Sequence, residues 1–167
     1  MNRESGMGAV RLERVILAPP HEVYRAWLEP ELLRRWLAPD GLSVKQAQVE
    51  PRVGGRFRIW HTDPHADAGG FECEIVELVP DRRIVFLWGF VGPERTSGPT
   101  FDSLLTVELQ PTGGEEGTLL TLLHERLDDL AAAMPHVAAI VESGWASALA
   151  KLVALGQRNS PEATRHA

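Results

Sequence analysis

The stretch from Val137 to Leu155, VAAIVESGWASALAKLVAL, carries the longest helical pattern in the sequence. Its large apolar side chains recur at spacings of three and four residues, which places them on one face of an α-helix. They are Ile140, Val141, Trp145, Leu149, Leu152 and Val153. The pattern predicts a long helix in the C-terminal part of the chain, with Trp145 on the face that meets a sheet.

Upstream of this helix, seven short segments have the pattern of β-strands. Each is rich in Val, Ile, Leu or aromatic residues and is bounded by Gly, Pro or Asp. The segments are 10–17, 44–50, 55–62, 70–79, 83–89, 101–110 and 118–125. Because the last six follow one another over short connections, the sequence predicts one seven-stranded antiparallel sheet.

Two short helices are expected between the first and second strands. Pro20 suits the first turn of a helix, and apolar residues as far as Leu28 follow it at helical spacing. Pro30 interrupts this pattern, which then resumes over residues 31–37. The resulting order of one strand, two short helices, six strands and one long helix predicts an α+β domain whose last helix covers one face of the sheet.

This order of elements also predicts an internal cavity. A sheet of seven antiparallel strands twists and curves, whereas a single helix is only about 10 Å wide. The helix therefore cannot fill the whole concave side of the sheet. We expect space between helix and sheet, closed at its ends by the short helices and by the longer loops at 63–69 and 90–100.

The composition is that of one globular domain. The chain has 167 residues, 44% apolar and 24% charged, and we expect a frayed N-terminus at 1–9, one domain at 10–156 and a polar tail at 157–167. The net charge of −6 disfavours nucleic acid as a partner. Because Cys73 is the one cysteine, and neither a signal peptide nor about 20 consecutive apolar residues occur, we expect a cytoplasmic protein without a membrane span.

Four segments, in this order, resemble one known family. They are VRLERVILAPPHEVYRAWLEPELLRRW at 10–36, PRVGGRF at 51–57, IVELVPDRRIVFLW at 75–88 and GWASALAKL at 144–152. With them the chain resembles the START-like (SRPBCC, polyketide cyclase-like) superfamily, in the branch of the activator of the heat-shock-ninety ATPase. The resemblance implies a helix-grip fold, in which a curved antiparallel sheet wraps round the long C-terminal helix, and a hydrophobic cavity in a small cytosolic bacterial protein.

The sequence departs from the pattern of this branch in two respects. Members often carry a histidine three positions before the glycine of the Gly-Trp pair, where this chain has Val141. Ligand chemistry that depends on such a histidine is therefore not expected. The additional N-terminal domain with which the eukaryotic activators grip the chaperone is also not seen in the sequence, which weakens a co-chaperone interpretation.

Two polar or glycine-rich motifs have simpler explanations than a binding site. The Gly54-Gly55 pair is followed by neither a helix start nor Lys-Ser/Thr, so we interpret it as a tight turn or bulge in a strand rather than as a phosphate cradle. Nitrogen and oxygen ligands for a transition metal also occur close together, at His61, Asp63, His65 and Asp67. Because Asp, His and Pro are common at solvated loop tips, we expect no metal site here.

A catalytic group is an alternative hypothesis for the cavity. His124 and Glu125 end one strand, and Glu72 and Glu74 lie near the start of another, so a histidine and a carboxylate could meet as general base and orienting group. Because side chains alternate along a strand, their meeting depends on which face of the sheet is concave. Paired surface charges are the simpler interpretation, and no residue is assigned a catalytic role.

The leading hypothesis is a protein that binds a hydrophobic or aromatic small molecule and needs no cofactor. Pockets for such ligands are lined by apolar and aromatic side chains with a few polar groups. The candidate lining residues are Phe57, Ile59, Trp60, His61, Trp88, Phe101, Leu105, Leu120, Leu122, His124, Trp145 and Leu149, with Arg56 as a further polar candidate. The alternatives are a cavity enzyme of cyclase or hydrolase type and a module that interacts with a heat-shock-ninety chaperone.

Charges in segment 10–17 favour a monomer or a weak homodimer.

Overall fold

The computed structural model describes residues 8–38, 41–63, 67–91, 103–112, 117–133 and 135–158. Over these residues the elements follow the order expected from the sequence, with one additional short helix. The elements are β1 (Ala9–Ile16), α1 (Pro20–Leu28), α2 (Pro30–Trp36), β2 (Ser43–Val49), β3 (Arg56–Thr62), β4 (Asp67–Val79), β5 (Arg83–Val91), β6 (Ser103–Pro111), β7 (Thr118–Glu125), α3 (Asp128–Ala133) and α4 (Pro135–Arg158).

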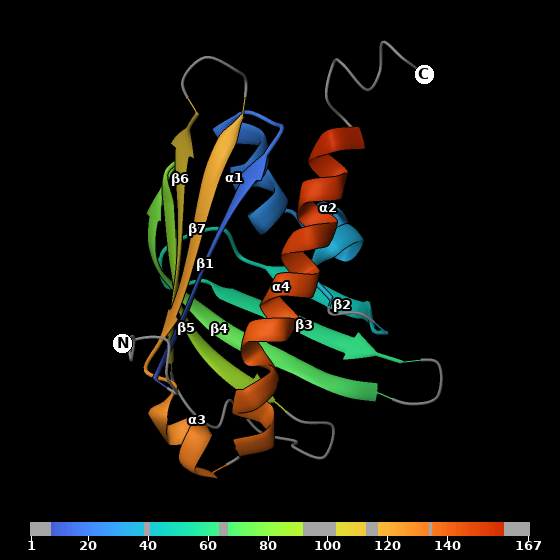
Figure 1. Cartoon of the computed structure of the whole chain (residues 1–167), viewed down its shortest axis with the longest axis vertical. Helices are drawn as coiled ribbons and strands as arrows, with labels where there is room; N and C mark the ends of the chain where they lie inside the picture. Colours follow the sequence, from blue (N-terminus) through green and yellow to red (C-terminus); the bar gives the residue numbers. More distant parts are fainter. Residues whose placement is uncertain are drawn as a thin grey trace.

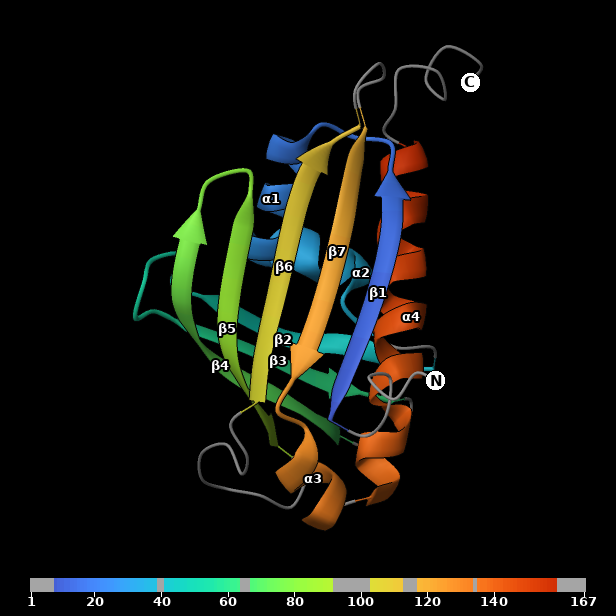
Figure 2. The ribbon, with the colours of Figure 1, turned by 60° about the vertical axis from the view of Figure 1, so that its left-hand side comes forward.

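All seven strands belong to one antiparallel sheet in the order β1-β7-β6-β5-β4-β3-β2. The first strand therefore pairs with the last, with Ala9 opposite Glu125 and Ile16 opposite Thr118. The sheet is strongly curved, so that β2 and β3 run across behind the upright strands β6 and β7 in Figure 2. The predicted α+β helix-grip fold is confirmed.

Helix α4 lies along the concave side of the sheet (Figure 1), where it contacts β1 and α2. Trp145, Leu149 and Leu152 are buried on its inner face, as the apolar spacing predicts. The predicted buried face of this helix needs one correction: Val141 is buried on it, whereas Ile140 is 60% exposed. The helix also begins at Pro135 rather than at Val137, since proline is accommodated in a first helical turn.

The two short helices α1 and α2 are joined at Glu29, which is the C-cap residue of α1 and the N-cap residue of α2. Their packing rests on two buried tryptophans, Trp27 and Trp36, whose ring centroids are 4.7 Å apart. The indole nitrogen of Trp36 donates a hydrogen bond to the carbonyl oxygen of Ala26 at 3.0 Å. Trp27 also packs on Phe86 of β5, so it attaches the pair of helices to the sheet.

Helix α3 is not visible in the sequence pattern, because its six residues are too few to show a helical period. It lies at the lower end of the sheet in Figure 1 and packs against α4. Leu127, just before it, and Leu130 within it are buried. The turn between β7 and α4 thereby adds apolar side chains to one end of the core.

By length and composition, one helix is long and apolar enough to cross a membrane, so the expectation that no segment meets these two criteria is wrong. Within the described residues, Ala139–Gln157 in α4 reaches a mean hydropathy of 1.3 over a sufficient length. Much of this value comes from small alanines and from the side chains that α4 buries against the sheet. In this window 39% of the residues are buried, on the face that meets the sheet, and the core helix of a globular protein can reach the same length and composition.

Candidate ligand cavity

A partly open cavity of about 230 Å³ lies between α4, the inner faces of β3, β4 and β5, and the segment that follows α2. Its lining is almost wholly apolar. The lining residues are Leu37, Ala38, Leu42, His61, Gly70, Phe71, Trp88, Phe90, Ile140, Val141, Gly144, Trp145 and Ala148. Sites of this kind bind small apolar molecules, and their few polar groups orient the ligand.

Strand alternation decides which residues reach the cavity. On β3 the buried residues are Phe57, Ile59 and His61, whereas Trp60, between the last two, is only partly buried. His61 comes last in this row, near the end of β3, and lines the cavity. Gly70 of β4 is required beside β3, because a Cβ at this position would collide with the carbonyl oxygen of Ile59.

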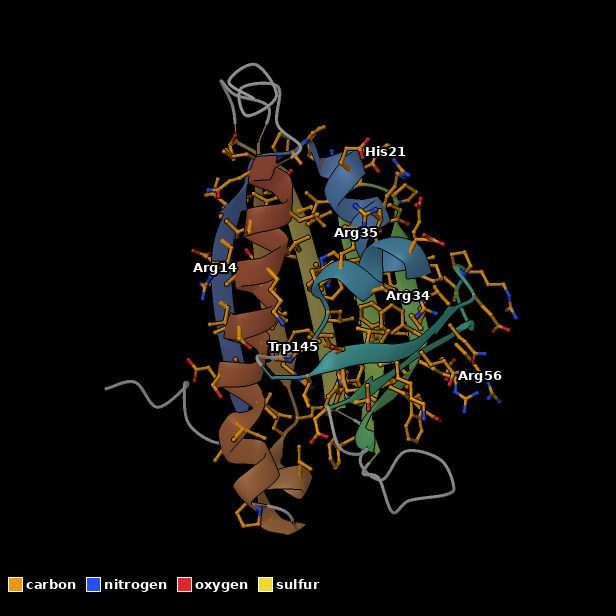
Figure 3. The ribbon with its side chains drawn as sticks, turned by 90° about the vertical axis from the view of Figure 1, so that its right-hand side faces the viewer. Arg14, His21, Arg34, Arg35, Arg56 and Trp145 are labelled. Carbon is orange, nitrogen blue, oxygen red and sulfur yellow. The ribbon has the colours of Figure 1, made fainter. Side chains whose placement is uncertain are left out.

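Aromatic rings form the inner wall of the cavity. The ring of Phe71 is the centre of this group, at centroid distances of 5.3 Å from Trp88, 5.9 Å from Trp145 and 5.8 Å from the imidazole of His61. Helix α4 contributes Trp145 at a position one turn after Val141, so both side chains face the sheet. Figure 3 shows Trp145 between α4 and the strands.

His61 is the ionisable side chain among the described residues that line the cavity. It is buried, and its Nε2 donates a hydrogen bond of 2.9 Å to the carbonyl oxygen of Leu37. A carbonyl can only accept, so Nε2 carries the proton. Burial is the largest influence on the pKa of His61 and lowers it. The hydrogen bond to Leu37 acts in the opposite direction and the nearby charge of Lys151 in the same direction as burial; the net pKa is lowered, so the imidazole is neutral near pH 7.

A second buried histidine, His124 on β7, lies behind the cavity wall. Its Nδ1 accepts a hydrogen bond of 3.1 Å from the indole nitrogen of Trp145, so its other nitrogen, Nε2, carries the proton. Nε2 donates to Oγ of Ser103 at 2.8 Å, and the Ser103 hydroxyl donates to the carbonyl oxygen of Trp88 at 3.1 Å. Burial lowers the pKa of His124 to about 3. With both nitrogens occupied, His124 is a structural link and not a free base.

The carboxylates considered for catalysis do not join His124. On β4 the inward positions are Phe71, Cys73 and Ile75, so Glu72 and Glu74 lie on the outer face of the sheet. There Glu72 accepts hydrogen bonds from Arg58, the shorter at 2.9 Å. By the same alternation Glu125 lies on the opposite face of β7 from His124. The hypothetical acid–base group is therefore not assembled.

The structure places the predicted lining residues in four different settings. His61, Trp88 and Trp145 line the cavity. Seven others are buried core residues that do not line it: Phe57, Ile59, Leu105, Leu120, Leu122, His124 and Leu149. Trp60 and Arg56 lie on the outer face of β3, and Arg56 points away from the molecule in Figure 3. Phe101 lies outside the described residues.

Several lining residues were not predicted from the sequence. Phe71 and Phe90 share the inward face with other aromatic residues, so an alternation argument applied to β4 and β5 could have found them. Leu37, Ala38 and Leu42 could not be found in this way, because they lie outside regular elements and carry no periodic pattern. Their position depends on where α2 ends over the sheet.

The described residues contain no group of three or more His, Cys, Asp or Glu side chains arranged to hold a metal ion. Among the four residues weighed as metal ligands in the sequence, His61 faces the cavity and is hydrogen-bonded to Leu37. His65 lies outside the described residues. The absence of a metal site therefore stays a prediction for this loop.

Comparison with known proteins gives one family and many related structures. The family model described as "Activator of Hsp90 ATPase homolog 1-like protein" matches residues 17–157. Protein CV1439 from Chromobacterium violaceum is 31% identical, with a TM-score of 0.74 over 90% of this chain and 97% of that chain. No curated protein gives a significant match.

Two further solved structures share the fold at lower identity. Protein NE0264 from Nitrosomonas europaea is 24% identical, with a TM-score of 0.68 over 92% of this chain and 97% of that chain. The AHSA1 (SPO3351) protein from Silicibacter pomeroyi is 23% identical, with a TM-score of 0.69 over 88% of this chain and 96% of that chain. The fold is thus found over nearly the whole length of several bacterial proteins.

Proposed function

Since the chain belongs to the Activator of Hsp90 ATPase homolog 1-like family, within the START-like superfamily, we propose that it binds an apolar small molecule in the cavity beneath α4. The driving force is the removal of apolar surface from water, about 25 cal/mol per Å². The aromatic wall formed by Phe71, Trp88 and Trp145 is part of this apolar lining.

One observation is the main support for this proposal: residue 144 of α4 is a glycine, so no side chain covers the helix backbone at the cavity. A glycine inside a helix is less stable than alanine by about 1 kcal/mol. A Cβ at Gly144 would meet nothing within 4 Å beyond the chain neighbours and the backbone of the helix itself, so packing within the protein does not require glycine here. Gly144 lines the cavity. The missing side chain leaves room for a bound molecule to approach the helix.

Calorimetric titration with a panel of apolar probes, namely naphthalene, biphenyl and decanol, tests the proposal. We expect at least one probe to bind the parent protein, and Gly144→Leu to abolish this binding by filling the cavity. Ala150→Leu is the matched control, because Ala150 lies on the exposed side of the same helix. Equal binding by Gly144→Leu and the parent, or no binding of any probe, would contradict the proposal.

A cavity enzyme has less support in the same geometry. Acid–base catalysis at neutral pH needs a group that can exchange a proton beside the substrate. Among the described lining residues only His61 is ionisable, and no carboxylate accompanies it. His124, also buried among the described residues, uses both ring nitrogens in hydrogen bonds.

The family description refers to activation of the Hsp90 ATPase, which is a different kind of function. The features that support ligand binding lie inside the fold, whereas a chaperone would bind the outer surface. A pull-down with the bacterial heat-shock-ninety homologue tests that activity separately. Chaperone capture that does not respond to Gly144→Leu would show that such an interaction is independent of the cavity.

We also propose a cytoplasmic monomer or weak homodimer. The one cysteine, Cys73, is buried, and burial raises its pKa, so it remains a thiol. The edge strand β1 carries Arg11, Glu13 and Arg14, and charged side chains on an edge discourage pairing with another sheet. Analytical ultracentrifugation measures the association state.

A further inference from the structure

We propose that His61 selects the bound molecule by accepting a hydrogen bond through Nδ1, so that the cavity prefers aromatic molecules that carry a hydroxyl or N–H donor. This inference rests on the proposed binding function and names the class of ligand. It concerns one atom in an otherwise apolar cavity.

The tautomer of His61 determines which ring nitrogen can accept a hydrogen bond. Nε2 donates to the carbonyl oxygen of Leu37 at 2.9 Å, and this carbonyl cannot donate in return. The imidazole is buried, and burial keeps its pKa below the ordinary value. The neutral ring therefore has its lone pair on Nδ1.

Nδ1 has no hydrogen-bond partner among the described residues. The ring lines the cavity together with apolar neighbours such as Leu42, Phe71 and Val141. Nδ1 keeps some accessible surface at the partly open cavity. A ligand that fills the cavity would remove this acceptor from water, which is unfavourable unless the ligand supplies a donor. Among the described side chains of this lining, Nδ1 of His61 and Nε1 of Trp88 have no hydrogen-bond partner. Nε1 can only donate and is fully buried, so Nδ1 is the acceptor available for orienting a ligand.

The aromatic rings near His61 offer a packing surface for a flat ligand. The rings of Phe71 and His61 pack in an edge-to-face arrangement with a centroid distance of 5.8 Å, and Phe71 also packs on Trp88 and Trp145. A flat ligand that packs against these rings has its edge close to His61. A donor on that edge, as in a phenol, satisfies Nδ1, whereas a hydrocarbon or an ether leaves the acceptor buried and unpaired.

Three probes of similar shape test the inference by calorimetry: naphthol, methoxynaphthalene and naphthalene. Leaving a buried acceptor unpaired lowers affinity roughly ten- to a hundredfold, so we expect naphthol to bind the parent more tightly than methoxynaphthalene by about this factor. His61→Phe keeps a flat ring but has no acceptor, and should bind both probes about equally. His61→Gln offers both a donor and an acceptor, and should restore part of the preference.

A second measurement reports on the atom itself. The nitrogen-15 resonance of His61 Nδ1 should move on addition of naphthol and stay nearly unchanged with methoxynaphthalene, which also covers the case in which His61→Phe does not fold. His21→Phe is the matched control, because His21 is exposed and pairs with Asp81 far from the cavity lining. This variant should keep the preference for naphthol.

The outcomes separate this inference from the proposed function. If all three probes bind the parent with equal affinity, the role of His61 is wrong while the binding function stands. If naphthol is preferred but His61→Phe keeps the preference, another group supplies the acceptor and the inference is also wrong. If no probe binds at all, the proposed function itself fails.

Discussion

The indole nitrogen of Trp145 lies 3.1 Å from Nδ1 of His124, and the resulting hydrogen bond joins α4 to β7, the strand next to the edge strand β1. Both residues are buried. The bond continues through Ser103 to the backbone of β5, so α4 is held by a polar chain as well as by apolar packing. Trp145 is part of this hydrogen-bond chain and also lines the cavity, so the chain borders the cavity on its inner side.

Replacing His124 should destabilise the fold. His124→Phe fills a similar volume but leaves the Trp145 N–H without an acceptor, and a buried unpaired donor costs about 1 to 3 kcal/mol. Urea unfolding measures the loss. Ser103→Ala is the second variant: it leaves the buried Nε2–H of His124 without its acceptor and should also cost about 1 to 3 kcal/mol. An unchanged free energy of unfolding for His124→Phe would show that the link does not stabilise the domain.

Stability should fall on acidification. The pKa of His124 is about 3 in the folded protein, and a histidine in the unfolded chain has an ordinary pKa near 6.5. Between these values the unfolded state binds more protons, so stability present above pH 6.5 is lost progressively as the pH falls toward 3. From His124 alone we expect a loss of about 2 kcal/mol between pH 7 and pH 5.

The pH dependence can be assigned by comparing urea unfolding of the parent and of His124→Phe at both pH values. The variant should lose about 2 kcal/mol less than the parent over this interval. His61, whose pKa is also lowered by burial, acts in the same direction and remains in both proteins. Equal pH dependence in the two proteins would place the effect elsewhere.

Truncation of Trp145 should be among the most damaging changes in α4. Trp145→Ala removes a large buried side chain and should cost about 3 to 5 kcal/mol unless the enlarged cavity is filled by a probe molecule. Trp145→Phe keeps a ring but loses the hydrogen bond to His124, and should cost less. Thermal unfolding with and without naphthalene measures both effects. A Trp145→Ala protein as stable as the parent would refute the packing of α4 on the sheet.

The two glycines before β3 should differ in their tolerance of a side chain. Gly54 has a positive φ of 85°, which strains any other residue by about 1 to 2 kcal/mol. A Cβ on Gly55 would collide with the carbonyl oxygen of Glu50, so Gly55→Ala should cost more than Gly54→Ala, and valine more than alanine at both positions. Thermal unfolding ranks the variants. Loss of probe binding without loss of stability would assign the pair to a site instead.

The fold could be predicted almost completely from the sequence, because its signals are local. Pro20 and Pro30 mark the starts of α1 and α2 through the fixed φ of proline, and the spacing around Trp145 predicts the buried face of α4. The predicted segment for β7 agrees with the structure residue for residue. Ends of other elements differ by one or a few residues, since such boundaries depend on tertiary contacts.

The candidate site could be predicted only in part. The sequence supplied the aromatic and apolar candidates of β3, but Trp60 was predicted to line the cavity together with Phe57, Ile59 and His61, although side chains alternate along a strand. In the structure Phe57, Ile59 and His61 share the buried face and Trp60 lies on the other. Only the tertiary structure decided which face is concave and that His61, Gly144 and the aromatic wall meet at one cavity. That choice depends on the curvature of the sheet and on the path of α4 across it, which arise from packing between residues far apart in the chain.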